Sequence, residues 1–106
     1  MKEALSTPQA THPMCVPDWL YEEVADRLKE AIGERRYFSG YISFEARRIT
    51  CRLTISLIVY RECVAWPEGE FERISDLVPI WWEFHSYKDG DDILNDFQFS
   101  EMRKYI

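Results

Sequence analysis

The stretch from Tyr37 to Arg61, "YFSGYISFEARRITCRLTISLIVYR", decides the predicted fold because its apolar residues recur at every second position. They occupy even positions between Phe38 and Ala46, and odd positions between Ile49 and Val59. An antiparallel hairpin whose paired residue numbers sum to 95 places both apolar sets on one side of a sheet. A slip by one residue would break this match, so the sequence predicts both the hairpin and its register.

Arg47 and Arg48 fall at the tip of this predicted hairpin. A tight two-residue turn needs positive φ at both central positions, which favours glycine, asparagine or aspartate. Because neither residue is of these types, we expect a four-residue loop built on a type I turn.

A helix is predicted before the hairpin, in "PDWLYEEVADRLKEAIG", residues 17–33. Leucine, valine, leucine and isoleucine recur there at every fourth position from Leu20 to Ile32. Pro17 suits the first turn of this helix, and Gly33 is a suitable stop. One face of the helix is therefore expected to be buried, with its acidic residues on the solvated face.

A third strand is predicted in "LVPIWWEFHSYK", where Val78, Ile80, Trp82 and Phe84 alternate with Trp81, Glu83, His85 and Tyr87. The first set is expected to face the helix. Pro79 cannot donate a ladder hydrogen bond, so it should lie at the start of the strand or on an edge. The second strand is expected to continue past Arg61 towards Trp66, and "EFERISD" is expected to form a connection.

Residues 93–99, "ILNDFQF", are ambiguous between strand and helix, and Ser100 is a suitable N-cap for a last short helix over residues 101–106. The predicted fold is an α+β two-layer sandwich: an N-terminal helix packed on a meander of three to four antiparallel strands, with a short C-terminal helix. Residues 1–16 lack periodicity and are expected to form a flexible or loosely docked arm, and residues 17–106 a single domain.

Composition excludes several classes of function. No apolar run reaches the ~20 residues that span a bilayer, and the N-terminus lacks the apolar core of a signal peptide, so we expect a cytoplasmic protein. The three cysteines show no zinc-ligand spacing, and the aspartates around Gly90 do not match a calcium loop, so no metal or cofactor is expected. The formal net charge of −6 disfavours a general attraction to nucleic acid.

The other face of the predicted sheet is the candidate interaction surface, because a solvated face does not ordinarily hold so many large rings. Three explanations for these rings are open: a cover formed by the C-terminal segment or the N-terminal arm, a dimer interface, or a ligand site. The candidate contact residues are Tyr41, Arg52, Tyr60, Trp81, Glu83, His85 and Tyr87.

Two further constellations are weaker. Arg47, Arg48 and Arg52 belong to the arginine-rich stretch 35–61 and are candidate phosphate contacts, although they can equally pair with the chain's own acids. Glu83 and His85 lie two apart on one strand, so the carboxylate could orient the imidazole for acid–base chemistry.

We therefore interpret the chain as a small non-enzymatic protein that contacts a protein partner, or a second copy of itself in a homodimer, through the aromatic outer face. Nucleic-acid contact by the arginine hairpin is the alternative, and an enzyme using Glu83 and His85 is the third hypothesis. No catalytic residue is assigned.

Overall fold

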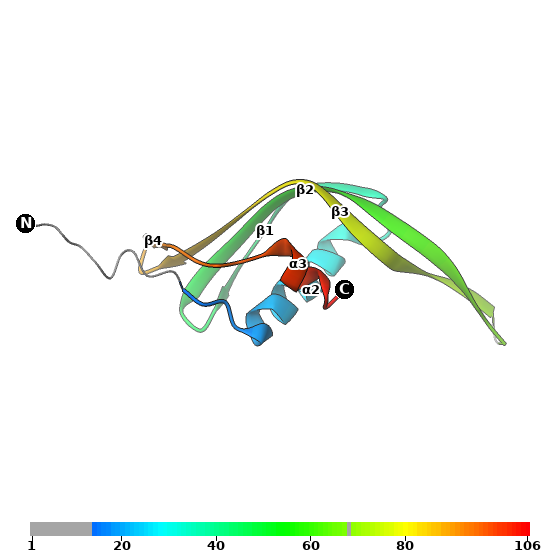
Figure 1. Cartoon of the computed structure of the whole chain (residues 1–106), viewed down its shortest axis with the longest axis horizontal. Coiled ribbons are helices and arrows are strands. Elements are labelled where there is room, and N and C mark those ends of the chain that lie inside the picture. Colours follow the sequence, from blue (N-terminus) through cyan, green and yellow to red (C-terminus); the bar gives the residue numbers. More distant parts are fainter. Residues whose placement is uncertain (1–13, 68) are drawn as a thin grey trace, which may run out of the picture.

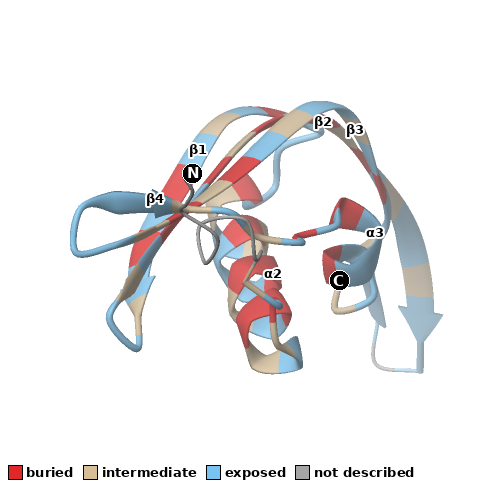
Figure 2. Cartoon of the chain, turned by 60° about the vertical axis from the view of Figure 1, so that its left-hand side comes forward, coloured by how far each residue is buried: buried red, intermediate tan, exposed pale blue. Residues whose placement is uncertain are grey.

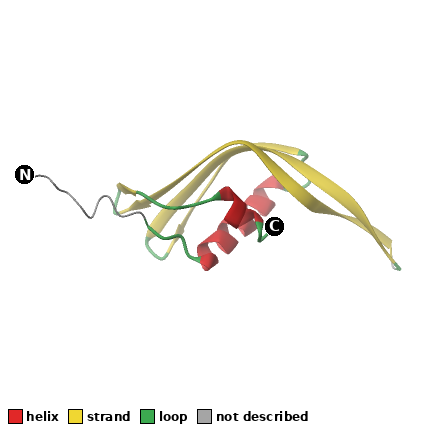
Figure 3. Ribbon diagram, in the orientation of Figure 1, coloured by secondary structure: helices red, strands yellow, loops and turns green. Residues whose placement is uncertain are grey.

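The computed structural model describes residues 14–67 and 69–106. A helix is followed by four strands and a second, short helix, and the strands form one antiparallel sheet in the order β1-β2-β3-β4 (Figure 1). The elements are α2 (Asp18–Ile32), β1 (Tyr37–Ala46), β2 (Ile49–Trp66), β3 (Gly69–Lys88), β4 (Asp91–Ile93) and α3 (Phe99–Arg103). The predicted α+β architecture is confirmed, with both helices on the same side of the sheet (Figure 3).

Helix α2 buries the apolar stripe that its sequence predicts. Leu20, Val24, Leu28 and Ile32 are each at most 1% exposed and belong to the same core as the inner residues of β1 and β2 (Figure 2). The helix ends at Gly33, whose φ of 58° lies in the left-handed region that glycine enters without steric cost.

The hairpin of β1 and β2 has the predicted register: each pair from Tyr37 with Ile58 to Ala46 with Ile49 sums to 95. The predicted four-residue loop is wrong. Only Arg47 and Arg48 separate the paired ends, with φ of 52° and 71°, as in a type I′ turn. The twist of the two strands matches a primed turn, and this match outweighs the local preference of arginine for negative φ.

Strand β3 is longer than predicted, and at two points an extra residue changes which of its side chains point towards the core. Ile80 is an extra residue where the register shifts between Ser56 and Leu57, so β3 has a β-bulge there. The bulge reverses the alternation, and the prediction that Val78 and Ile80 face the core is wrong: they are 38% and 62% exposed. Pro79 lies beside the bulge. Among the described residues, no strand pairs with the other side of β3 at this point, as expected for a proline on an edge.

Leu77 takes the inner position that the alternation assigned to Val78, and it is fully buried opposite Val59. A second register shift leaves Ser75 as another extra residue, between Ile74 and Asp76. The expectation that "EFERISD", residues 70–76, is a connection is wrong, because this segment pairs with β2 as far as Trp66.

Residues 60–66 and 69–76 form a two-stranded ribbon beyond the core. Among the described residues, its two strands pair only with each other, whereas β1 pairs with β2 up to Ile58 and β4 pairs only with Ser86 to Lys88. Figure 1 shows the ribbon extending past both helices, and Figure 2 shows that it is largely exposed. The ribbon is therefore a projection. Ile74 packs against the core, and Arg61 and Glu72 link the ribbon to the residues that follow α2.

The C-terminal segment covers the inner face of the sheet beside α2. Phe97 is 4% exposed and stacks on Phe84 with a centroid distance of 4.1 Å, while Trp82 and Tyr21 approach the same ring at 5.5 and 5.2 Å. The explanation in which this segment covers the outer face is therefore wrong. Phe97 instead fills the space between helix and sheet.

The ends of the C-terminal segment also differ from expectation. Residues 93–99 contain the end of β4, an isolated bridge from Asn95 to Met14 and the start of α3. The last helix begins at Phe99 after an N-cap at Gln98, so Ser100 is not its N-cap. Helix α3 ends at Arg103, before the expected end of the helix at residue 106.

The last residues of the predicted N-terminal arm pack against this segment. Met14 donates its backbone N–H to the carbonyl of Leu94, and the N–H of Val16 reaches Oδ1 of Asp96 at 2.7 Å. Val16 is 7% exposed. Residues 1–13 of the predicted arm lie outside the described residues.

Candidate interaction surface

The outer face of the sheet consists of rows of three residues, which the register brings together from β1, β2 and β3. Trp81 lies in a row with Ser56 and Ser39, whose hydroxyl oxygens are 2.8 Å apart. The neighbouring row on one side contains Tyr37, Ile58 and Val78. On the other side, the next row contains Tyr41, Thr54 and Glu83, and the row after it contains Ser43, Arg52 and His85. Five of the seven predicted contact residues lie in these rows. Tyr60 and Tyr87 lie on the same face in the next rows at either end, opposite Asp76 and Thr50, and Trp81 lies on β3 at the end of its row.

Large aromatic side chains remain exposed on this face. Tyr37, Tyr41, Tyr60 and Trp81 are between 50% and 57% exposed. In the part of the chain that the structure describes, both helices and the C-terminal segment lie on the opposite side of the sheet (Figure 1). The sheet arches over the helices, so this face curves outward (Figure 1).

Sequence reasoning missed two apolar members of this surface, Val78 and Ile80. Their positions follow from the bulge, which no alternation pattern can place by itself. Pro79 was the available signal, because a proline inside an otherwise regular strand marks an edge or a bulge.

Arg52 is held on the outer face by its neighbour Tyr41. Its guanidinium carbon lies 4.2 Å from the centroid of the Tyr41 ring, which is a cation–π contact. Arg47, at the hairpin turn, stacks in the same way on Trp19 of α2, also at 4.2 Å. Among the described residues, no carboxylate lies within ion-pair distance of Arg47, Arg48 or Arg52.

The other arginines of the stretch 35–61 serve the fold or lie elsewhere. Arg61 donates hydrogen bonds to the carbonyls of Gly33 and Arg35 at 2.6 and 2.9 Å, where its positive charge complements the C-terminal end of the α2 dipole. Arg36 pairs with Glu72 at 3.1 Å. Of the arginines in residues 35–61, only Arg47, Arg48 and Arg52 therefore lie around the hairpin turn.

Glu83 and His85 contact each other as their spacing predicts. Nε2 of His85 lies 2.9 Å from Oε1 of Glu83, and Nδ1 lies 3.8 Å from a carboxylate oxygen of Asp92. The side chain of His85 is 36% exposed and that of Glu83 is 55% exposed, both on the outward-curving face. Acid–base catalysis needs a concave site that holds the substrate against the catalytic pair. The geometry orients the imidazole but leaves it partly exposed on this outward-curving face.

The cysteines show no sign of an activated thiol. Burial raises the pKa of the fully buried Cys51 to about 11. The carboxylate of Asp96 raises the pKa of the exposed Cys15 thiol, because its negative charge and hydrogen bond disfavour the thiolate. Within residues 14–67 and 69–106, no three His, Cys, Asp or Glu residues gather in a way that could hold a metal ion.

No protein family, curated protein sequence or solved structure was found to match this chain. None of the helices in the described ranges combines the length and apolar character needed to cross a membrane.

Proposed function

We propose that this chain is a small cytoplasmic, non-enzymatic protein that binds a protein partner through the outer face of its sheet. The observation that carries the proposal is the row around Trp81, which no other segment of residues 14–67 and 69–106 covers, and which is flanked by Tyr37, Val78 and Ile80 on one side and Tyr41 on the other. A contiguous apolar patch of this kind on a folded domain usually marks an interaction site. Three free cysteines among the described residues support a reducing compartment.

Trp81 is the expected anchor of this contact. It is half exposed, shares the outer face with Val78 and the exposed tyrosines, and is of a residue type enriched at interface hot spots. Removing such an anchor costs about 2 kcal/mol or more of binding free energy, which is about a 30-fold loss of affinity.

The test is capture of partners from a nuclease-treated extract of the native host, followed by affinity measurement with the purified partner. Trp81→Ala should weaken binding about 30-fold. Leu94→Ala is the control, because Leu94 is similarly exposed, at 58%, but lies in the segment after β4. Equal binding by the wild type and Trp81→Ala would contradict the proposal. Light scattering of the purified protein shows whether the partner is a second copy.

Nucleic-acid contact is the second candidate, and the stacking of Arg52 on Tyr41 favours it. An exposed ring beside a guanidinium can stack a base while the cation contacts a phosphate. Charge reversal of Arg47, Arg48 and Arg52 should then abolish a steeply salt-dependent binding to single strands. Failure of the wild-type protein to bind any single strand at low salt would end this hypothesis.

A further inference from the structure

The charge of the chain changes sign between residues 46–61 and residues 62–72. Residues 46–61 contain four arginines and no acid, whereas residues 62–72 contain four glutamates and no lysine or arginine. The change of sign falls where β2 leaves the core and enters the ribbon. One end of the sheet is therefore a cationic turn and the other an acidic ribbon.

The cationic end is the arginine turn, Arg47 and Arg48. Both residues are exposed, and both have positive φ, so the turn presents them outward from the end of the hairpin. The stacking of Arg47 on Trp19 and of Arg52 on Tyr41 supplies apolar surface next to the positive charges. The turn is thus both cationic and aromatic.

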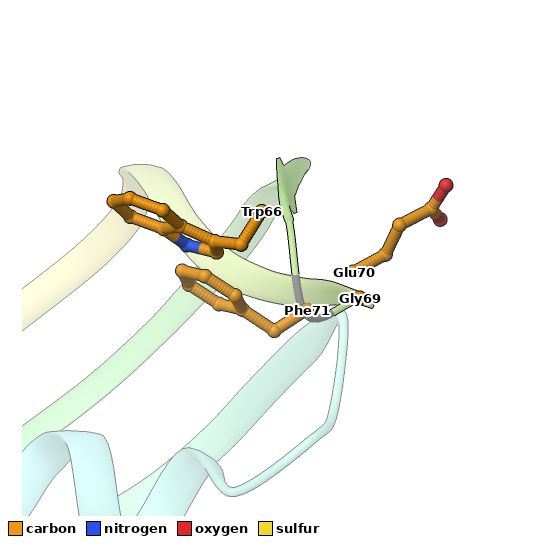
Figure 4. A pocket seen from close by; sticks show the side chains of 4 residues that line it. All are labelled: Trp66, Gly69, Glu70 and Phe71. Carbon is orange, nitrogen blue, oxygen red and sulfur yellow. The ribbon is translucent and has the colours of Figure 1, made fainter.

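The acidic end is the ribbon tip, formed by Trp66, Gly69, Glu70 and Phe71. Trp66 and Phe71 are 56% and 45% exposed and stack on each other, with a centroid distance of 6.1 Å and an angle of 8° between their planes. The four residues line a shallow hollow (Figure 4). The carboxylate of Glu70 points away from the two rings into solvent (Figure 4).

The acids nearer the base of the ribbon are already neutralised. Glu62 pairs with Arg73 at 2.7 Å, and Glu72 pairs with Arg36 at 3.1 Å. In the part of the chain that the structure describes, Glu70 has no cation within ion-pair distance. The tip therefore offers an unneutralised carboxylate beside two exposed rings.

We propose that the ribbon tip of one copy docks on the arginine turn of a second copy. The two ends cannot meet within one chain, because the 18 residues of β2 hold them roughly 50 Å apart. Glu70 would accept hydrogen bonds from Arg48, and Trp66 and Phe71 would pack against its guanidinium, as Tyr41 already does with Arg52. A contact between two different surfaces leaves one of each free, so association proceeds head to tail into open chains.

Charge complementarity also indicates that the partner of each surface is a second copy of this chain. The same chain carries both surfaces, each combining exposed charge with exposed aromatic rings. Since the surfaces lie at the ends of the sheet, their contact does not require two outward-curving faces to pack together (Figure 1). This inference does not depend on a partner for Trp81.

Light scattering and sedimentation of the full chain test the proposal. At low salt, the average mass of the wild-type protein should rise with concentration beyond that of a dimer, and high salt should reverse the rise because it screens the charges. Glu70→Lys/Glu72→Lys and Arg47→Glu/Arg48→Glu should each weaken association at least about tenfold, since close like-charge contacts cost more than 1.4 kcal/mol. Glu30→Lys, an exposed change on α2, is the control and should behave as the wild type.

Mixing the two charge-reversed proteins gives the decisive result. In the mixture, the unchanged arginine turn of the first variant meets the unchanged acidic tip of the second, and the lysine tip of the first also complements the glutamate turn of the second. The mixture should therefore associate under conditions in which each variant alone does not. Circular dichroism confirms that each variant is folded.

A wild-type protein that stays monomeric at low salt, or a mixture that does not associate, overturns the proposal. A dimer that is insensitive to both charge reversals but lost in Trp81→Ala overturns it as well, and supports the outer-face contact instead.

Discussion

Phe97 should be among the most important single side chains for stability outside α2 and the central strands. It is 4% exposed and packs against Phe84, Trp82 and Tyr21, so it joins the C-terminal segment to both the sheet and the helix. Replacing a buried phenylalanine by alanine costs about 3–5 kcal/mol, and each aromatic pair adds about 0.5–1.5 kcal/mol beyond its buried area. We expect Phe97→Ala to lower the free energy of unfolding by about 4 kcal/mol.

The assay is urea unfolding followed by circular dichroism, with the slope m compared between variants to check that unfolding remains two-state. Phe71→Ala is the matched control, because the same residue type lies 45% exposed on the ribbon, and its replacement should cost less than about 0.5 kcal/mol. If Phe97→Ala does not fold, Phe97→Leu should still fold, with a loss of about 1–2 kcal/mol. A loss below about 1 kcal/mol for Phe97→Ala would refute the placement of this segment against the inner face.

Three further predictions concern a hydrogen bond, a turn and a thiol. Tyr21→Phe should cost about 1–2 kcal/mol in urea unfolding, because the hydroxyl accepts the N–H of Gln98 at 3.0 Å, and an equal stability would exclude this role. Arg47→Asn/Arg48→Gly should stabilise the protein by about 1 kcal/mol, because each non-glycine residue at positive φ costs about 1–2 kcal/mol. The loss of the cation–π contact between Arg47 and Trp19 offsets part of this gain. A lower melting temperature of the variant would contradict the prediction. The pKa of the Cys51 thiol is about 11 in the folded protein and 9.0 in the unfolded chain, so the thiol loses its proton first in the unfolded state. The free energy of unfolding should therefore fall as the pH rises from 9 to 11. This fall should be smaller in Cys51→Ala, and equal pH profiles for the two proteins would contradict the burial of the thiol.

The sheet register and the helix were predictable because they depend on local periodicity. Period-two alternation across residues 37–61 admits one pairing that buries both apolar sets, and the spacing of four in residues 20–32 admits one buried helical face. The turn between the strands was not predictable from its residues, because the twist of the paired strands imposed positive φ on Arg47 and Arg48.

The candidate surface was predictable only in part. Trp81, Tyr41 and Arg52 lie together as the alternation predicts, because β1 and the central part of β2 are regular. Val78 and Ile80 join them because of a bulge that inserts one residue into β3.

The sequence by itself determined the hairpin register, the buried stripe of α2 and the change of charge between residues 46–61 and 62–72, since each depends on residues close in the chain. Only the tertiary structure decided which face the C-terminal segment covers. Phe97 could have packed on either side of the sheet, and the inner side prevails because it buries the ring against Phe84, Trp82 and Tyr21 together. The rings around Trp81 are left in solvent as a consequence.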